Sequence, residues 1–205
     1  LKMLSDGRHR FSVKAVNALG SAGPVSSFEV WIDTTPPSIT GTSPDSGAVL
    51  KVLSSTVTAT LTESASGVNA ASIRLLVNGS AAPASFNQAT GVLSASPSSW
   101  LQGSNRIELA VADVLGNNQT PLVWSVIMDT IPPAGSITLN AGASVTTSVY
   151  VTLGLSASDL TSGVKSVRIS NDPLTHFVEE PFVPMRTLWR LNALRGLQTV
   201  YIKYV

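Results

Sequence analysis

The sequence repeats itself at an interval of 96 residues, and this internal repeat limits the folds that the chain can adopt. Shifting the chain by that interval places Asp33–Pro37 (Asp-Thr-Thr-Pro-Pro) on Asp129–Pro133 (Asp-Thr-Ile-Pro-Pro). At the same offset Ser66-Gly67-Val68 falls on Ser162-Gly163-Val164. A third stretch also matches, in which the residues Phe11, Val13, Ala15, Asn17, Leu19 and Gly20 correspond to Ile107, Leu109, Val111, Asp113, Leu115 and Gly116. Separate matches at one offset indicate a tandem array of similar units.

The repeat predicts three units. Residues 1–35 are expected to be the C-terminal strands of a truncated module, residues 36–131 a complete module, and residues 132–205 a module that lacks its last strand. The segment 196–205 matches 103–112, so the last unit stops one position before the counterpart of Asp113. The Pro-Pro pair that opens each unit predicts a stiff, extended connection, because proline fixes φ.

Alternation of apolar and polar residues in 36–131 predicts an all-β fold. The apolar residues of the expected strands occur at every second position, which is the period of a strand with one buried face. About seven such short strands, separated by turn residues, predict an antiparallel β-sandwich, with a closed barrel as the weaker alternative. The residues expected to face the core are Val57, Ala59, Leu61, Ile73, Leu75, Ile107, Leu109, Val111 and Val126.

Composition excludes several classes of function. The chain has no cysteine, which rules out disulfide scaffolds, thiolate metal sites and cysteine nucleophiles. The formal net charge of +1 argues against a nucleic-acid partner, and no apolar run approaches the ~18 residues that membrane insertion needs. The two histidines, His9 and His176, fall in different units, so no catalytic constellation is expected and the chain is predicted not to be an enzyme.

Several motifs resemble those of a known class of repeat. They are the pattern Asp-Gly-x-His-x-Phe-x-Val-x-Ala at 6–15, the Asp-Thr-Thr-Pro-Pro junction at 33–37, and the Ser-Gly-Val turns at 66–68 and 162–164. Across its whole length the chain resembles the bacterial immunoglobulin-like repeats of large secreted and cell-surface proteins, including adhesins. The resemblance implies tandem immunoglobulin-like sandwiches of about 96 residues each. It further implies a structural or adhesive role as stalk or display rod, an extracellular, cell-surface or periplasmic location, and neighbouring modules of the same chain as partners.

A carbohydrate-binding accessory module of a secreted enzyme is one alternative. Arg186, Arg190 and Arg195 surround Trp189, a mixture that could bind surface polysaccharide or another protein, although Trp189 is expected to pack inward. Trp31 and Trp124, in the last strand of a module, are expected at core or rim positions. Exposure of Trp100 and Trp189 distinguishes this alternative from a stalk.

A self-assembling surface fibre is the second alternative. The expected strand 198–205 lacks the following strand that pairs with its counterpart in the complete module, and its apolar side chains Val200, Ile202 and Tyr204 share one face. Residues 26–33 of a second copy could complete this open C-terminal module, which would give homo-assembly by strand exchange.

Calcium is the only cofactor that the sequence suggests. Acidic residues recur at matched places near the expected module junctions, where carboxylates from several loops could meet around an ion that takes oxygen ligands. The open alternative is that each acidic residue caps its own turn by accepting backbone N–H groups. The candidate ligands are Asp33, Glu63, Asp113, Asp129 and Asp159.

Overall fold

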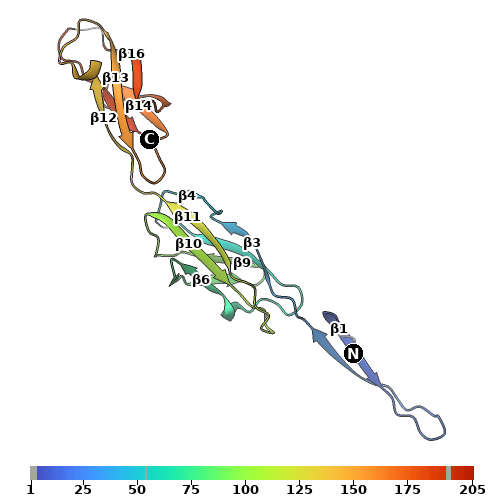
Figure 1. The fold of residues 1–205 in the computed structure, drawn as a ribbon. Coiled ribbons are helices and arrows are strands. Elements are labelled where there is room, and N and C mark those ends of the chain that lie inside the picture. The colour runs from blue at the N-terminus through green and yellow to red at the C-terminus, as the bar shows by residue number, and fades with distance from the viewer. Residues whose placement is uncertain (1–3, 54, 193–194) are drawn as a thin grey trace. The chain divides into compact units, whose positions relative to one another are not determined.

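A computed structural model describes residues 4–53, 55–192 and 195–205 (Figure 1). The chain divides into two compact units, Leu1–Ala48 with Leu53–Met128 and Val49–Val52 with Asp129–Val205. The module boundaries expected at residues 35 and 131 stay a prediction. Helical structure in the described part consists of two 3-10 turns, η1 (Ala70–Ser72) and η2 (Asn140–Gly142), and neither has the length and apolar character that crossing a membrane requires.

A two-stranded hairpin begins the first unit. Its strands are β1 (Gly7–Val13) and β2 (Ser26–Ile32), which pair antiparallel from Gly7 opposite Ile32 to Val13 opposite Ser26. The hairpin makes a sheet of its own, with no third strand among the described residues (Figure 1).

Two sheets form the central sandwich. One has the order β3-β5-β9-β8 and the other the order β4-β11-β10-β6-β7. The strands of the first are β3 (Ser38–Ser43), β5 (Val57–Thr62), β8 (Ala84–Asn87) and β9 (Val92–Ala95). Those of the second are β4 (Val49–Leu50), β6 (Arg74–Val77), β7 (Ser80–Ala81), β10 (Gly103–Ala110) and β11 (Leu122–Met128).

The strand order of this sandwich is that of an immunoglobulin-like domain. Lettering β3, β5, β6, β8, β9, β10 and β11 as A to G gives one sheet with A, B, E and D adjacent and a second with G, F and C adjacent. This is the arrangement of the constant-type immunoglobulin sandwich, here without a cysteine pair. The prediction of all-β, antiparallel sandwich architecture is therefore confirmed.

The central core consists of the alternate residues of both sheets, as the sequence predicts. Of the expected core residues only Ile73 is not fully buried. It is the C-cap of η1, so the strand begins one residue later, at Arg74. The buried residues of these strands include Val57, Ala59, Leu61, Leu75, Val77, Leu93, Ile107, Leu109, Val126 and Met128, and the expected core residue Val111 just after β10 is buried as well.

The second unit also contains two sheets, of order β12-β13-β16 and β15-β14-β17. The strands are β12 (Ala134–Leu139), β13 (Tyr150–Ser158), β14 (Ser166–Ser170), β15 (Val178–Pro181), β16 (Met185–Arg190) and β17 (Tyr201–Tyr204). By the same lettering they are A, B and E in one sheet, and C, F and a strand beside C in the other. Among the described residues β17 is an edge strand, whereas its counterpart β10 lies between β6 and β11. Ile202 and Tyr204 of β17, and Val200 just before it, pack against the core of this unit.

Tyr204 connects the two sheets of this unit. A Cβ atom at position 135 would lie 2.3 Å from Cε2 of the Tyr204 ring. The ring therefore occupies the space that any side chain at Gly135 would need. Its hydroxyl donates a hydrogen bond of 2.6 Å to the carbonyl of Ser136 on β12. Only glycine at position 135 leaves room for this contact.

Replacing Leu109 by alanine should lower the free energy of unfolding by about 2–5 kcal/mol, because truncating a fully buried leucine leaves a cavity. The matched control is Leu115→Ala in a surface turn, where the expected change is within about 0.5 kcal/mol. Denaturant unfolding followed by tryptophan fluorescence measures both. An equal decrease in the free energy of unfolding in the two variants would contradict the burial of Leu109.

Candidate functional site

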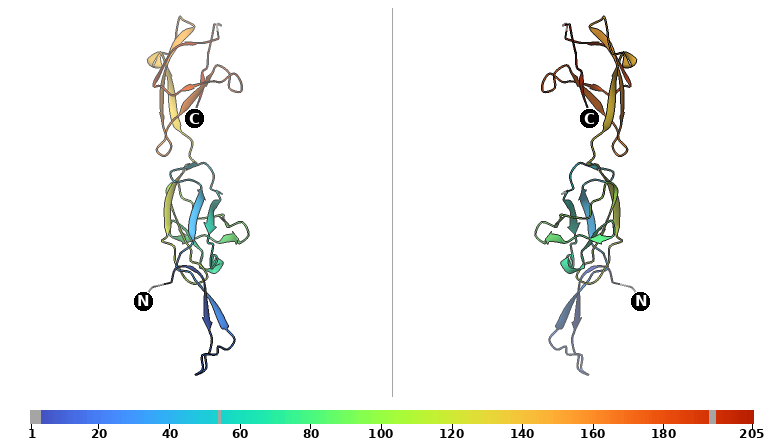
Figure 2. Two further views of the ribbon diagram at one scale, coloured as in Figure 1. Left: turned by 90° about the vertical axis from the view of Figure 1, so that its right-hand side faces the viewer. Right: turned by 90° about the vertical axis from the view of Figure 1, so that its left-hand side faces the viewer.

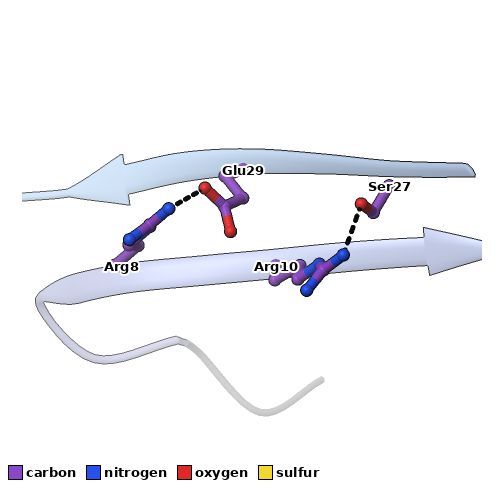
Figure 3. Close-up of polar contacts among 4 residues, drawn as sticks. All are labelled: Arg8, Arg10, Ser27 and Glu29. Atoms are coloured by element: carbon purple, nitrogen blue, oxygen red, sulfur yellow. Dashed lines mark hydrogen bonds and ion pairs between the residues drawn. The ribbon is translucent and has the colours of Figure 1, made fainter.

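One face of the hairpin β1–β2 is polar, and the side chains on it bind one another. Arg8 on β1 forms an ion pair with Glu29 on β2, and Arg10 Nη2 donates a hydrogen bond of 2.9 Å to Ser27 Oγ (Figure 3). Arg10 stands directly opposite Glu29, and Arg8 lies diagonally from it. Cross-strand pairs of this kind support the hairpin, each with a small contribution at an exposed site.

The opposite face of the hairpin is apolar and uncovered. Alternation along the strands places Phe11 and Val13 of β1 on this face together with Phe28 and Val30 of β2. Phe11 is 53% exposed, Val13 69% and Phe28 70%. Side chains of this size normally lie in a core, and a contiguous exposed group of them marks an interaction surface.

The uncovered face matches a core face elsewhere in the chain. Gly7 pairs with Ile32 and Phe11 with Phe28, and 96 residues later Gly103 pairs with Met128 and Ile107 with Trp124. The hairpins β1–β2 and β10–β11 thus have the same register. On β10–β11 the equivalent side chains are buried, among them Ile107, Leu109, Trp124, Val126 and Met128.

Asp33, one of the predicted site residues, follows β2 and accepts hydrogen bonds from three other residues. Its carboxylate accepts hydrogen bonds from the backbone N–H groups of Thr35 (3.1 Å) and Ser66 (3.2 Å). Its carbonyl oxygen accepts one from Asn117 Nδ2 (3.0 Å). Both residues after it are also fixed, because the hydroxyls of Thr35 and Thr34 donate to the carboxylate of Asp6 and hold the pKa of that group below its ordinary value.

Asp113 is fully buried and accepts hydrogen bonds from Asn117. The backbone N–H of Asn117 donates to Oδ1 (2.7 Å), and its Nδ2 donates to Oδ2 (2.6 Å). Burial is the largest single influence and raises the pKa of this carboxyl, but the hydrogen bonds that it accepts, those from Asn117 first, together outweigh burial, so its pKa lies below its ordinary value. Asn117 therefore bridges Asp33 and Asp113, a role that only its place in a turn could have suggested.

Glu63, Asp129 and Asp159 each accept backbone N–H groups of their own turns. Glu63 binds the N–H groups of Ser64, Ala65 and Gly67, and Asp159 binds those of Thr161, Ser162 and Gly163. The N–H of Ile131 donates to Asp129, as that of Thr35 does to Asp33. These contacts are those of turn-capping carboxylates.

The structure brings three of the predicted ligands to one neighbourhood. Asp33 and Glu63 both bind N–H groups of the loop 63–67, and Asn117 joins Asp33 to Asp113. In the described ranges no three or more acidic or histidine side chains form a group that could hold a metal ion. Calcium at these five positions stays a prediction.

The tryptophans separate into buried and exposed ones. Trp100 and Trp124 are each 6% exposed, and their indole N–H groups donate to the carbonyls of Ser55 and Pro44. The expectation of a core or rim position holds for Trp124 but was wrong for Trp31, which is 61% exposed. Trp31 stands opposite Arg8, on the polar face of the hairpin, because it lies an odd number of residues from Phe28.

Comparison with known proteins gives only distant similarities. No protein-family model matches the sequence, and no curated protein matches it. Among solved structures, the chain is similar to the fibronectin(III)-like modules of CbhA from Clostridium thermocellum, with 15% identity over 81% of this chain and 83% of that chain and a TM-score of 0.42. It is also similar to dimeric latent PorU from Porphyromonas gingivalis, with 16% identity over 97% of this chain, 20% of that chain and a TM-score of 0.39. The chain thus spans about a fifth of the PorU chain.

Replacing Asn117 by alanine should lower the free energy of unfolding at pH 7, and this difference from the wild type should shrink on acidification. A carboxyl whose folded-state pKa is depressed stabilises the fold above its unfolded-state pKa, and that contribution is lost as the pH falls through the folded-state value. For Asp113 the loss lies below its ordinary value of 3.8. Asn118→Ala, an exposed neighbour, is the control. Denaturant unfolding at pH 7 and at pH values below 3.8 measures the effect, and a constant difference would count against it.

If Asp33, Glu63 and Asp113 bind calcium, millimolar calcium should raise the melting temperature of the chain. An ion that binds only the folded state stabilises that state. Magnesium at equal concentration controls for ionic strength. An unchanged melting temperature would remove the prediction and leave turn capping as the role of these carboxylates.

Proposed function

We propose that this chain is a segment of a large extracellular or cell-surface protein in which immunoglobulin-like sandwiches follow one another as a stalk or display rod. In this proposal residues 1–35 are the last two strands of one sandwich, residues 36–131 form the next, and residues 132–205 belong to a third. The partners are neighbouring sandwiches of the same chain, and the role needs neither catalysis nor a cofactor.

The shared register of β1–β2 and β10–β11 is the observation that carries this proposal. Two hairpins 96 residues apart have the same pairing and the same apolar face, which is buried in one and uncovered in the other. A two-stranded hairpin on its own is at best marginally stable in water. The natural cover for such a face is the opposite sheet of a sandwich.

The contacts of the linker also favour a spacer role. Asp33 is held by Ser66 and Asn117 of the following sandwich, and Pro36 and Pro37 come directly after the threonines that Asp6 binds. Fixed φ angles and hydrogen bonds on several sides leave the connection little freedom to rotate. A connection of this kind maintains spacing along a stalk.

Hydrogen exchange tests the organisation. If residues 7–13 and 26–32 belong to a sandwich, their amides should exchange at least about tenfold more slowly when the segment that precedes this chain in the natural protein is included. The amides of β10–β11 serve as the internal control, because their sandwich is already complete. Unchanged exchange in β1–β2 would overturn the proposal for residues 1–35.

Antibody labelling tests the location. Antibodies raised against the chain should label intact cells of the source organism as strongly as permeabilised cells. Antibodies against a cytoplasmic protein should label only the permeabilised ones. Labelling that requires permeabilisation would contradict a role outside the cell, whatever the hydrogen-exchange result.

A further inference from the structure

A polar hollow of about 520 Å³ opens on the second unit, apart from the acidic turns and the hairpin described above. Its volume lies within the range of pockets that hold small ligands. The loop after β14 and the strand β16 supply its wall, with the residues Ser170, Asn171, Asp172, His176, Arg186, Leu188, Trp189, Arg190 and Asn192.

A β-bulge in β16 shapes one side of the hollow. Val151 pairs with Trp189 and Leu153 with Arg186, so one residue of β13 stands opposite two of β16. Residues three apart on a regular strand point to opposite faces, and the extra residue brings Arg186 and Trp189 to the same face. The guanidinium carbon of Arg186 lies 6.0 Å from the indole centroid of Trp189.

The bulge also contains strained backbone. Leu188 has a φ of +55° and is 72% exposed, and His176 across the hollow has a φ of +58°. Such values are unusual for a residue as bulky as leucine, and positions of this kind concentrate at ligand sites. Two of them in the wall of one hollow point to a site with a function.

The opposite wall is a loop fixed by its own hydrogen bonds. Ser170 Oγ donates to the carbonyl of Thr175 and accepts from the N–H of Asp172. Asn171 accepts from the indole N–H of Trp189 (2.9 Å) and donates to the carbonyl of Arg190 (2.9 Å), which holds the loop against β16. A wall formed before the ligand arrives lowers the entropic cost of binding.

The charges of the hollow favour a ligand with one anionic group and several hydroxyls. Arg186 is paired with Glu180, but no described residue pairs with the side chain of Arg190. Asp172 binds the N–H groups of Leu174 and Thr175 through Oδ1, and Oδ2 remains as an acceptor. A carboxylate can bind Arg190 with two parallel hydrogen bonds, whereas hydroxyls can donate to Asp172.

We propose that this hollow binds a sugar unit that carries a carboxylate, as part of an acidic glycan. The carboxylate pairs with Arg190 and ring hydroxyls donate to Asp172. Trp189, covered by Arg186 on one side and packed against the core, forms the floor of the hollow. Asn171 is a positioning residue, since it orients Trp189. An acidic peptide fits less well, because it has no ring hydroxyls to donate to Asp172.

Calorimetric titration of the whole chain with trigalacturonate at low ionic strength tests the proposal. We expect saturable binding that Arg190→Gln weakens at least about tenfold, through loss of a charge-assisted pair of hydrogen bonds. Arg8→Gln, at an exposed arginine of the hairpin, is the matched control and should bind as the wild type does. Equal melting temperatures of the variants establish that each is folded.

Two further ligands make the test selective. Maltotriose, which lacks the carboxylate, and triglutamate, which lacks the sugar rings, should both bind at least about tenfold more weakly than trigalacturonate. Asp172→Asn should narrow the difference in affinity between triglutamate and trigalacturonate, because it removes the anionic acceptor of the ring hydroxyls. No binding of trigalacturonate, binding unaffected by Arg190→Gln, or triglutamate binding at equal strength would each overturn the proposal, the last in favour of an acidic-peptide site.

Discussion

Burial of alternate apolar side chains between two sheets is the interaction on which the rest of this structure depends. In the central sandwich both sheets contribute fully buried residues, among them Leu61 and Leu109, and non-directional burial of this kind is the main favourable term in folding. The hairpin β1–β2 shows the same strand pattern without the second sheet. Its Phe11 and Phe28 are exposed although the register equals that of β10–β11. Strand pairing therefore fixes the register locally, but only an opposite sheet completes the fold.

The acidic turns lie outside that apolar interaction and have a different role. Asp33, Asp113 and Glu63 accept backbone N–H groups that turns leave without partners, and a buried N–H without a partner is costly. Asn117 Nδ2 adds a hydrogen bond to the carboxylate of Asp113 and another to the backbone carbonyl of Asp33. A carboxylate supplied with several N–H donors is stabilised as an anion without an ion beside it. The same residue types that suggest calcium ligands from the sequence thus have a sufficient role in holding loops to the linker.

The alternation of apolar and polar residues predicted the sandwich and nearly all of its core. A strand that is buried on one face has an apolar residue at every second position, and this pattern can be read directly from the sequence. The exception, Ile73, follows a 3-10 turn whose cap, Asn69, gives no periodic signal. Trp31 was expected at a core or rim position because it lies in the last strand of a module, yet strand alternation places it with Arg8 on the polar face. The contacts of Asp33 with Ser66 and Asn117 could not be predicted, because loops distant in sequence provide them, whereas the other carboxylates bind N–H groups of their own turns. The bulge at Leu188 was equally hidden, since no glycine marks it.

The second unit shows how such a scaffold can acquire a binding site without loss of its core. The register shift between Val151 and Leu153 leaves both of these residues buried, so the core side of β13 is unaffected. The change falls on the other strand, β16. Among the described residues β16 is the edge strand of its sheet, so no further strand there has its register disturbed. An extra residue at such an edge turns Arg186 and Trp189 to one face, at a cost of about 1–3 kcal/mol for the strained residue Leu188. Under the two proposals made above, a sandwich keeps a spacer role through its core and linkers while one rim diverges toward recognition, because burial determines the first and edge geometry the second.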